Sequence, residues 1–239
     1  MELEAYNLRR FQQIMGDYEN IKFPTPLFPY VTKRVLVETF EPGSHISRYM
    51  DNPGGQLQKN LARIGTDALL DMLFIHNFVH GDLHPGNILV QDTHQPRLVL
   101  LDCGIATSLM PFDLLQMRAL FTAIVKGDGV QVADLMLGSQ PCPTVEEYRR
   151  NMAELVSRGL QGLTRIQNVK VSNLFSELFD VLMKHKVRIE PNYTSVVMAI
   201  MVIDGLGRSL DPSLNLLEAV TPCLLHRART QLTDYIVGS

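Results

Sequence analysis

Three oxygen-bearing side chains at fixed spacing in the first half of the chain could act together on a phosphate group. Asp82 and Asn87 stand five residues apart in the run HGDLHPGN (80–87), and Asp102 follows fifteen residues after Asn87 in LDCG (101–104). A carboxylate beside an attacking hydroxyl or water can accept or orient its proton, which suits Asp82. Magnesium prefers hard oxygen ligands and keeps several waters, which suits the amide oxygen of Asn87 and the carboxylate of Asp102. The pattern therefore predicts a catalytic aspartate followed by two magnesium ligands.

The order of these residues is that of a kinase catalytic loop, H-x-D-x-x-x-x-N, followed by a D-x-G metal motif. We expect His80 to hydrogen-bond the loop and the turn at Asp102. His84 could contact substrate or phosphate in the nucleotide site, or could be a turn residue packed under the loop. Cys103, where protein kinases usually carry Phe, is expected to be a small packing residue rather than a reactive thiol.

The run RVLVETF (34–40) is apolar and β-branched, which predicts a buried strand. It precedes the catalytic loop by about forty residues, the position of the hinge in a kinase. The main-chain groups of Glu38, Thr39 and Phe40 would then hydrogen-bond adenine, although a plain buried strand would carry the same residues. Glu4 lies in a helix predicted for 2–15 and is either the Glu that pairs with the strand Lys of a kinase or a solvated helix charge.

The elements predicted around these residues indicate a protein-kinase-like α+β fold that is mostly α. A long helix with an apolar stripe over 61–76 precedes the catalytic loop, and a hairpin of 88–90 and 98–101 carries the two motifs. Almost everything beyond Pro111 reads as helix. We expect residues 1–41 to be a remnant of an N-terminal lobe, consisting of a helix and the hinge strand, and the rest of that lobe to be largely absent. Residues 42–239 would form the helical C-terminal lobe with additional helices.

Composition excludes several other classes of protein. Apolar residues make up 46% and charged residues 20% of the 239 residues, which is typical of a globular chain. The net charge of −3 gives no attraction to nucleic acid. Three cysteines without paired spacing argue against a disulfide framework and a zinc knot. No signal or transit peptide is visible, and no apolar run approaches the roughly 20 residues of a spanning helix.

Six segments are distinctive in residue type and order: FVHGDLHPGNILV (78–90), LLDCG (100–104), FTAIVKGD (121–128), KHKVRIEP (184–191), IDGLGRSLDP (203–212) and EAYN (4–7). Through these segments the chain resembles the aarF/UbiB family of atypical kinases over nearly its whole length. The resemblance implies a mitochondrial, ATP-binding and magnesium-dependent protein connected with coenzyme Q biosynthesis and lipid metabolism. Its partners would be ATP, a lipid or small-molecule substrate, coenzyme Q biosynthetic proteins and a membrane surface. By motif, Asp82 would be the catalytic aspartate, Asn87 and Asp102 the magnesium ligands, and Glu4 the ion-pair Glu.

The sequence also departs from that family, which leaves the activity of this chain open. The family's K-x-G-Q helices, Ala-rich nucleotide loop and phosphate-contacting Lys all precede the E-A-x-N helix, and these 239 residues do not include them. Glu4 would therefore lack its Lys, and the isolated chain is expected to be weakly active or inactive. One alternative is a non-catalytic fragment or isoform that binds lipid or protein through apolar surface near 35–36. Another is an aminoglycoside- or choline-type phosphotransferase, since such enzymes share HGDLHPGN, but the 184–212 segment argues against it.

Overall fold

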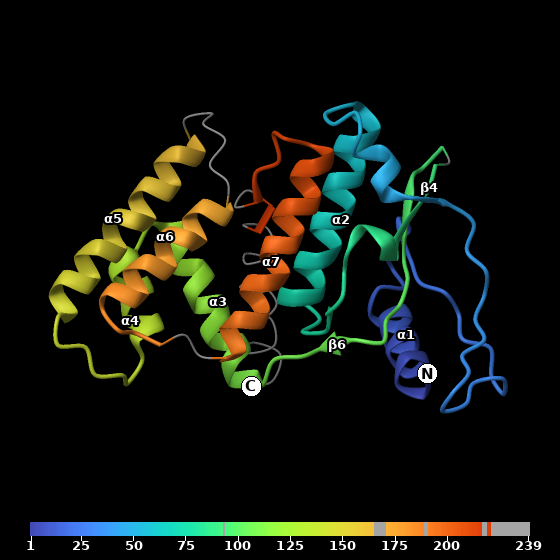
Figure 1. Cartoon of the computed structure of the whole chain (residues 1–239), viewed down its shortest axis with the longest axis horizontal. Helices are drawn as coiled ribbons and strands as arrows, with labels where there is room; N and C mark the ends of the chain where they lie inside the picture. Colours follow the sequence, from blue (N-terminus) through green and yellow to red (C-terminus); the bar gives the residue numbers. More distant parts are fainter. Residues whose placement is uncertain (93, 165–170, 189–190, 217–218, 221–239) are drawn as a thin grey trace, which may run out of the picture. The chain divides into compact units, whose positions relative to one another are not determined.

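The computed structural model describes residues 1–92, 94–164, 171–188, 191–216 and 219–220, and the side chains of 162–164, 171–172, 191–199 and 203 are not described. The chain forms two compact units, Met1–Ser108 with Gly205–Leu214, and Leu109–Asp204 with Asn215–Ser239. Figure 1 gives the order of the elements along the chain.

The first unit carries every residue of the predicted site. Its elements are α1 (Glu2–Ile14), β1 (Ile21–Lys22), β2 (Ser44–His45), the 3-10 helix η1 (Ile46–Tyr49), α2 (Gln56–Phe74), β3 (Val79–His80), the 3-10 helix η2 (Pro85–Asn87), β4 (Ile88–Gln91), β5 (Arg97–Leu100) and β6 (Ala106–Thr107). The helices predicted for 2–15 and 61–76 are thus confirmed as α1 and α2, and the predicted hairpin as β4 and β5.

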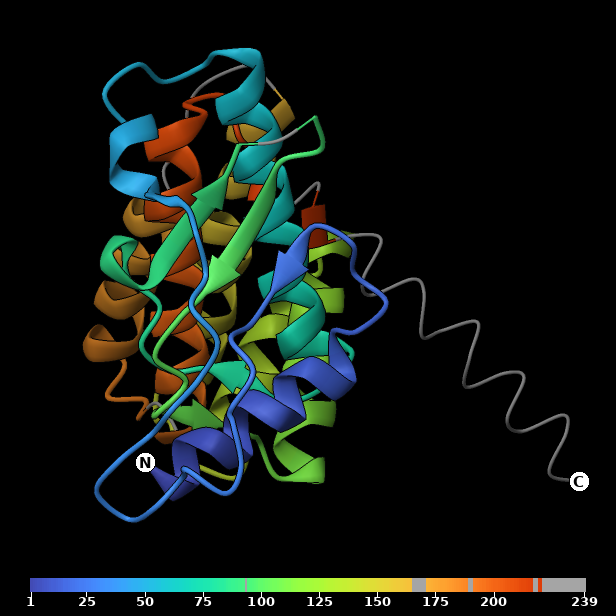
Figure 2. The same cartoon turned by 90° about the vertical axis from the view of Figure 1, so that its right-hand side faces the viewer.

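A four-stranded sheet of order β1-β5-β4-β2 forms the centre of this unit. The hairpin strands β4 and β5 are antiparallel, and β1 lies parallel to β5 (Figure 2). Ile88 and Leu89 of β4 and Leu98 and Val99 of β5 are all buried, because both faces of the hairpin are covered. Helix α2 approaches β5 closely at Gly65, where a Cβ atom would lie 3.3 Å from Cδ1 of Leu98. The hairpin that joins the two motifs is therefore held in the core.

The prediction of a buried strand at 34–40 is wrong. Only Glu38 forms a strand-like bridge, antiparallel to Pro26, and Val35 and Phe40 are 51% and 89% exposed. Two main-chain hydrogen bonds flank this bridge: the N–H of Leu27 donates to the carbonyl of Val37 at 2.8 Å, and the N–H of Thr39 donates to the carbonyl of Thr25 at 3.0 Å. Residues 34–41, called the hinge segment below after their predicted role, thus form an extended and partly exposed chain outside the four-stranded sheet.

The second unit is helical. It contains α3 (Pro111–Lys126), α4 (Gly129–Leu137), α5 (Val145–Thr164), α6 (Val171–Lys184) and the first part of α7 (Pro191–Leu210), whose last turns belong to the first unit. These helices confirm the prediction of helix beyond Pro111, whereas the helix predicted from about 214 to the C-terminus lies almost wholly outside the described residues.

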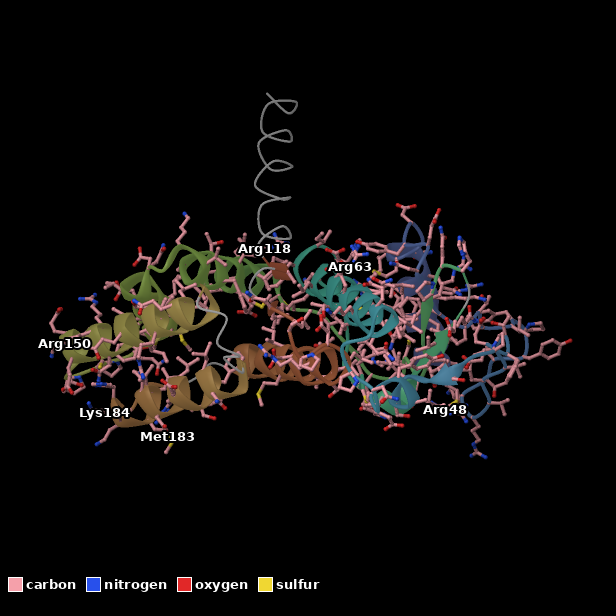
Figure 3. The ribbon with its side chains drawn as sticks, turned by 90° about the horizontal axis from the view of Figure 1, so that it is seen from above. Arg48, Arg63, Arg118, Arg150, Met183 and Lys184 are labelled. Atoms are coloured by element: carbon pink, nitrogen blue, oxygen red, sulfur yellow. The ribbon has the colours of Figure 1, made fainter. Side chains whose placement is uncertain are left out.

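Packing in this unit follows from its buried apolar faces. Tyr148, Met152 and Leu182 lie in one core cluster. An ion pair of 2.8 Å between Lys184 and Glu147 ties the end of α6 to α5, and Met183 projects from the same end (Figure 3). Among the described residues, no helix combines the length and the apolar character needed to cross a membrane.

Candidate active site

Two loops of the first unit are brought together by the short strands β3 and β6. The strands are antiparallel, with His80 opposite Ala106, and the main-chain N–H of Gly81 donates to the carbonyl of Ile105 at 2.8 Å. A Cβ atom at Gly81 would lie only 2.6 Å from Cγ2 of Ile105, so this approach requires glycine. The pairing holds the start of the catalytic loop (80–87) against the end of the loop 101–105, called the metal loop below after the role predicted for Asp102.

His80 connects the same two loops through its ring. Nε2 lies 2.9 Å from the carbonyl oxygen of Leu101, and Nδ1 accepts a hydrogen bond of 3.2 Å from the main-chain N–H of Asp82. Both bonds form together only in the neutral ring with its proton on Nε2. Burial lowers the pKa of His80 and favours that neutral form. The hydrogen-bonding role predicted for His80 is confirmed.

Acid should therefore destabilise the fold through His80. Its pKa in the folded chain is below the ordinary value of 6.5, so the unfolded chain binds more protons as the pH falls below 6.5. The contribution of His80 to stability is complete above pH 6.5 and is lost as the pH falls toward the lowered pKa. We expect Tm to fall more between pH 7.5 and 5.5 in the native chain than in His80→Gln, whose amide can still donate to Leu101. Parallel Tm curves for the two proteins would contradict this role.

Asn87 fixes the far end of the catalytic loop. The side-chain Nδ2 of Asn87 donates to the main-chain carbonyl of Asp82 at 3.0 Å. The main-chain carbonyl of Asn87 accepts from the N–H of Leu101 at 2.9 Å. With Nδ2 engaged, Oδ1 is the side-chain atom that remains for a cation. The Nδ1 atom of His84 accepts from the N–H of Gly86 at 3.0 Å, which makes His84 the cap of η2 and a turn residue.

Asp102 occupies an unusual backbone conformation at the centre of the metal loop. Its φ is 51°, in the left-handed region, and its Oδ1 accepts weakly from the N–H of Gly104 at 3.4 Å. Such a conformation is uncommon outside glycine and is frequent at functional sites. The side chains of Asp102 and Asp82 are both exposed at the surface of the unit. Their carboxylates are therefore accessible to a ligand.

A buried polar residue of α1 holds the metal loop in place. Nδ2 of Asn7 donates to the carbonyl of Cys103 at 2.8 Å, and both side chains are buried. Burial, and then the charges of Glu4, Glu38 and Asp102, raise the pKa of the Cys103 thiol. The prediction that Cys103 is an inert packing residue is confirmed. The hydrogen bond from Asn7 to this loop was not predicted. A polar residue on the apolar stripe of a helix could have indicated such a buried hydrogen bond.

Three carboxylates gather beside the metal loop. Burial and the charge of Asp102 raise the pKa of Glu4, while burial and then the charges of Glu4, Asp102 and Glu41 raise that of Glu38. A Cβ atom built on Gly104 would lie 3.2 Å from Oδ1 of Asp102 and 3.9 Å from Oε2 of Glu4. In the described part of the chain no ion pair reaches Glu4 or Glu38. This region therefore carries negative charge that a cation would neutralise.

The donor set fits magnesium held together with phosphates. Across the described ranges, no three His, Cys, Asp or Glu side chains come close enough to form a metal site from protein atoms alone. Magnesium is usually bound by one or two carboxylates, waters and the phosphates of a substrate. One amide oxygen from Asn87 and one carboxylate from Asp102 meet that requirement.

The hinge segment is oriented by Thr39. Its N–H donates to the carbonyl of Thr25 at 3.0 Å, and the N–H of Thr25 donates to Oγ1 of Thr39 at 2.9 Å. Main-chain groups alternate in direction along an extended chain, so the carbonyl of Glu38 and the N–H of Phe40 point away from Thr25. The edge formed by the carbonyl of Glu38 and the N–H of Phe40 therefore offers one acceptor and one donor to a planar base.

Comparison with known proteins places most of the chain in two described domains. Residues 1–136 match the ABC1 atypical kinase-like domain, and residues 163–215 match the UbiB helical domain. The chain is 31% identical to the probable serine/threonine-protein kinase abkC of Dictyostelium discoideum, covering 99% of this chain and 44% of that protein. It is 27% identical to a mitochondrial ABC1 family protein of Schizosaccharomyces pombe, covering 94% and 39%. The chain thus spans less than half the length of these relatives.

The fold has a solved counterpart. The structure of Rv3197 with erythromycin, from Mycobacterium tuberculosis, matches with a TM-score of 0.65 and 14% identity, over 93% of this chain and 58% of that one. At this identity the likeness concerns the fold alone, which is the kinase-like fold expected from the sequence. With its first 136 residues matched by the family's kinase-like domain, the chain belongs to the ABC1, or aarF/UbiB, family of atypical kinases.

Proposed function

We propose that this chain binds Mg-ATP and carries the phosphoryl-transfer residues of an ABC1-family atypical kinase or ATPase. The observation that best supports the proposal is the double link between the two loops. His80 bonds both loops, and Asn87 bonds the main chain of Asp82 and that of Leu101, the residue before Asp102. Loops joined in this way keep their exposed carboxylates in a fixed relation, which catalysis by positioning requires.

The proposed roles follow from the chemistry of each side chain. Asp82 would accept or orient the proton of the attacking group. Oδ1 of Asn87 and the carboxylate of Asp102 would hold magnesium, which neutralises charge on the transferring phosphate. The carbonyl of Glu38 and the N–H of Phe40 would bind adenine. Phosphoryl transfer depends mainly on positioning and electrostatic stabilisation, so these few groups form a minimal set for it.

The proposed acceptor is water, a lipid or a small molecule rather than a peptide. Only 105–110 separate Gly104 from the start of α3 at Pro111, which is too short for the activation segment on which peptide kinases bind their substrate. A mitochondrial location is proposed because the Schizosaccharomyces pombe relative is named as mitochondrial. A link to coenzyme Q and lipid metabolism, and association with a membrane surface, are proposed on the family resemblance.

One alternative is a binding module without catalysis. The exposed Val35 and Phe40 and the uncompensated charges of Glu4 and Glu38 favour it, because a partner could cover the former and neutralise the latter. The match of 163–215 to the UbiB helical domain argues against an aminoglycoside- or choline-type enzyme.

Calorimetric titration of the full 239-residue chain with ATP tests the proposal. We expect binding with Mg²⁺ that weakens at least about tenfold in EDTA, since one metal bridge to the phosphates is worth more than about 1.4 kcal/mol. Asp102→Asn should lose the gain in ATP affinity that Mg²⁺ gives the native chain. Asp51→Asn, at an exposed position outside the site, should bind ATP as the native chain does.

Equal ATP binding by Asp102→Asn and the native chain would contradict the metal role of Asp102. A folded chain that binds no nucleotide would favour the binding module. Steady-state turnover of the isolated chain is expected to be weak.

A further inference from the structure

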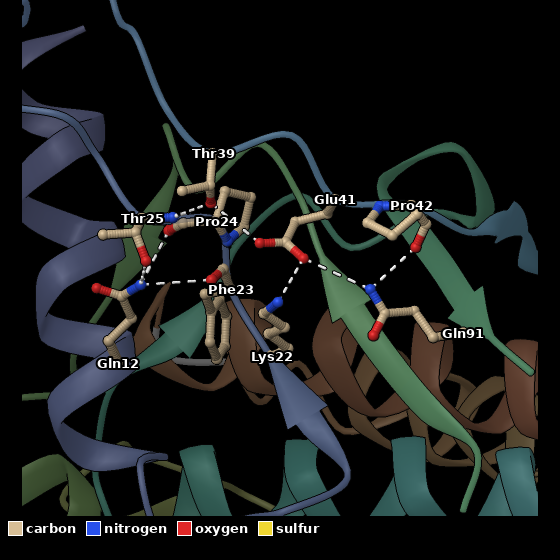
Figure 4. A network of polar contacts seen from close by, with 9 residues as sticks. All are labelled: Gln12, Lys22, Phe23, Pro24, Thr25, Thr39, Glu41, Pro42 and Gln91. Atoms are coloured by element: carbon tan, nitrogen blue, oxygen red, sulfur yellow. Dashed lines mark hydrogen bonds and ion pairs between the residues drawn. The ribbon is translucent and has the colours of Figure 1, made fainter. Parts of the chain in front are cut away.

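Glu41, at the end of the hinge segment, has a buried carboxylate that is bonded on both oxygens. Its side chain is 4% exposed. Oε2 forms an ion pair of 2.7 Å with Nζ of Lys22 on β1 and lies 3.5 Å from Nε2 of Gln91 on β4. Oε1 accepts a hydrogen bond of 3.0 Å from the hydroxyl of Thr39 (Figure 4). A buried charge is tolerated only when it is paired in this way, so the end of the hinge is confined to one position.

The same bonds determine which way the hinge faces. The hydroxyl of Thr39 donates to Glu41 and accepts from the N–H of Thr25, while the N–H of Thr39 donates to the carbonyl of Thr25. Thr39 is therefore held on both its main chain and its side chain. Along an extended chain, the main-chain N–H and C=O groups of successive residues point in opposite directions. Because those of Thr39 face Thr25, the main-chain groups of Glu38 and Phe40 lie on the edge that faces away from Thr25.

Two further contacts connect this network to the catalytic elements. Nε2 of Gln91 donates to the carbonyl of Pro42 at 2.9 Å, and Gln91 ends the strand that begins directly after Asn87. Nε2 of Gln12 on α1 donates to Oγ1 of Thr25 at 2.8 Å and lies 3.1 Å from the carbonyl of Pro24. Figure 4 shows these side chains converging on the segment from both sides. The hinge is thereby held in register with the strand that follows the catalytic loop.

We propose that Glu41 is a positioning residue for recognition of the base in the nucleotide site, because it holds Thr39 so that the carbonyl of Glu38 and the N–H of Phe40 face the base. This inference rests on the proposed function, because it names the residue that orients one part of the same site. Glu41 does not touch the nucleotide in this account. It acts through Thr39, and its loss should weaken recognition of the base without weakening recognition of the phosphates.

The test compares two ligands on the full chain: Mg-ATP, and Mg-tripolyphosphate, which shares the three phosphates and lacks the whole nucleoside. Glu41→Gln keeps the size of the side chain but removes the ion pair with Lys22. We expect Glu41→Gln to weaken Mg-ATP binding about tenfold, corresponding to one lost charge-assisted contact, and to leave Mg-tripolyphosphate binding within about twofold. Glu19→Gln, at an exposed position before β1, is the charge-matched control and should change neither affinity.

A second variant keeps the test valid if Glu41→Gln unfolds the chain. Thr39→Val keeps the shape of a partly exposed side chain and replaces only the hydroxyl with a methyl group. It should weaken Mg-ATP binding selectively too, by less than the tenfold expected for Glu41→Gln. Equal weakening of both ligands in either variant would mean that the network only stabilises the fold, and would overturn the inference.

Unchanged affinity of both variants for both ligands would overturn the inference as well. Equal affinity of the native chain for the two ligands would also overturn it, and in that case the proposed magnesium–phosphate site would stand. A native chain that binds neither ligand would reject the proposed function itself, and this inference with it.

Discussion

Replacement of Phe11 by alanine is expected to lower the free energy of unfolding by about 3–5 kcal/mol, the usual cost of removing a buried aromatic ring. Phe11 is fully buried on α1. Its ring stacks on Phe23 with centroids 5.0 Å apart and an interplanar angle of 9°, and contacts Phe78 at 4.5 Å. These rings join α1 to the segment before the hinge and to the segment before β3, so no neighbour can fill the cavity without moving an element of the site.

The same substitution should also disturb the two loops, because the ring of Phe11 lies 6.0 Å from that of His80. Chemical denaturation followed by circular dichroism measures the effect. Tyr6→Ala on the same helix is the control, since Tyr6 is 61% exposed and its loss should change stability by less than about 0.5 kcal/mol. Similar denaturation midpoints for the two variants would show that α1 is not anchored through Phe11.

Asp82→Asn is expected to separate binding from chemistry. The side chain of Asp82 is exposed and does not belong to the predicted metal ligands, so Mg-ATP affinity should stay within about threefold of the native value. The rate of phosphate release should fall by about 10²–10⁴-fold, the usual contribution of a general base. Single-turnover measurement with excess protein and radiolabelled ATP can detect such slow rates in the isolated chain.

The Asp82→Asn substitution should leave the loop itself in place. Asn87 and His80 both bond main-chain atoms of Asp82, and the substitution changes only the side chain. A changed rate can therefore be assigned to the carboxylate rather than to a displaced loop. Phosphate release that continues unchanged in Asp82→Asn would show that this carboxylate is not the base.

Local patterns in the sequence were sufficient to predict most of the fold around the site. The hairpin follows from two short apolar runs and the turn between them, and α2 from its apolar stripe. The spacing of Asp82, Asn87 and Asp102 identified the loops because kinase chemistry restricts both the residue types and their separation. The link through His80 could be predicted for the same reason.

Features that depend on distant pairing could not be predicted in this way. The run at 34–40 has strand-like composition, but it pairs with 25–27 through a single bridge, and nothing local to the run reveals that neighbour. Glu41 has the sequence context of an ordinary turn residue, because its partner Lys22 is nineteen positions away and Gln91 fifty. The sequence points only to the main chain of Glu38, whereas its carboxylate also lies near Glu4 and Asp102.

The most direct test of the central claim is to locate the metal with Mn²⁺, which replaces Mg²⁺ and broadens nearby NMR signals. In an amide spectrum of the full chain with ATP, we expect Mn²⁺ to broaden the side-chain amide of Asn87 and the N–H of Gly104 first, and Asp102→Asn to abolish that selectivity. The resonances of the exposed Asp51 should stay sharp. Broadening that is uniform, centred elsewhere or unchanged in Asp102→Asn would contradict a magnesium–nucleotide site at these loops.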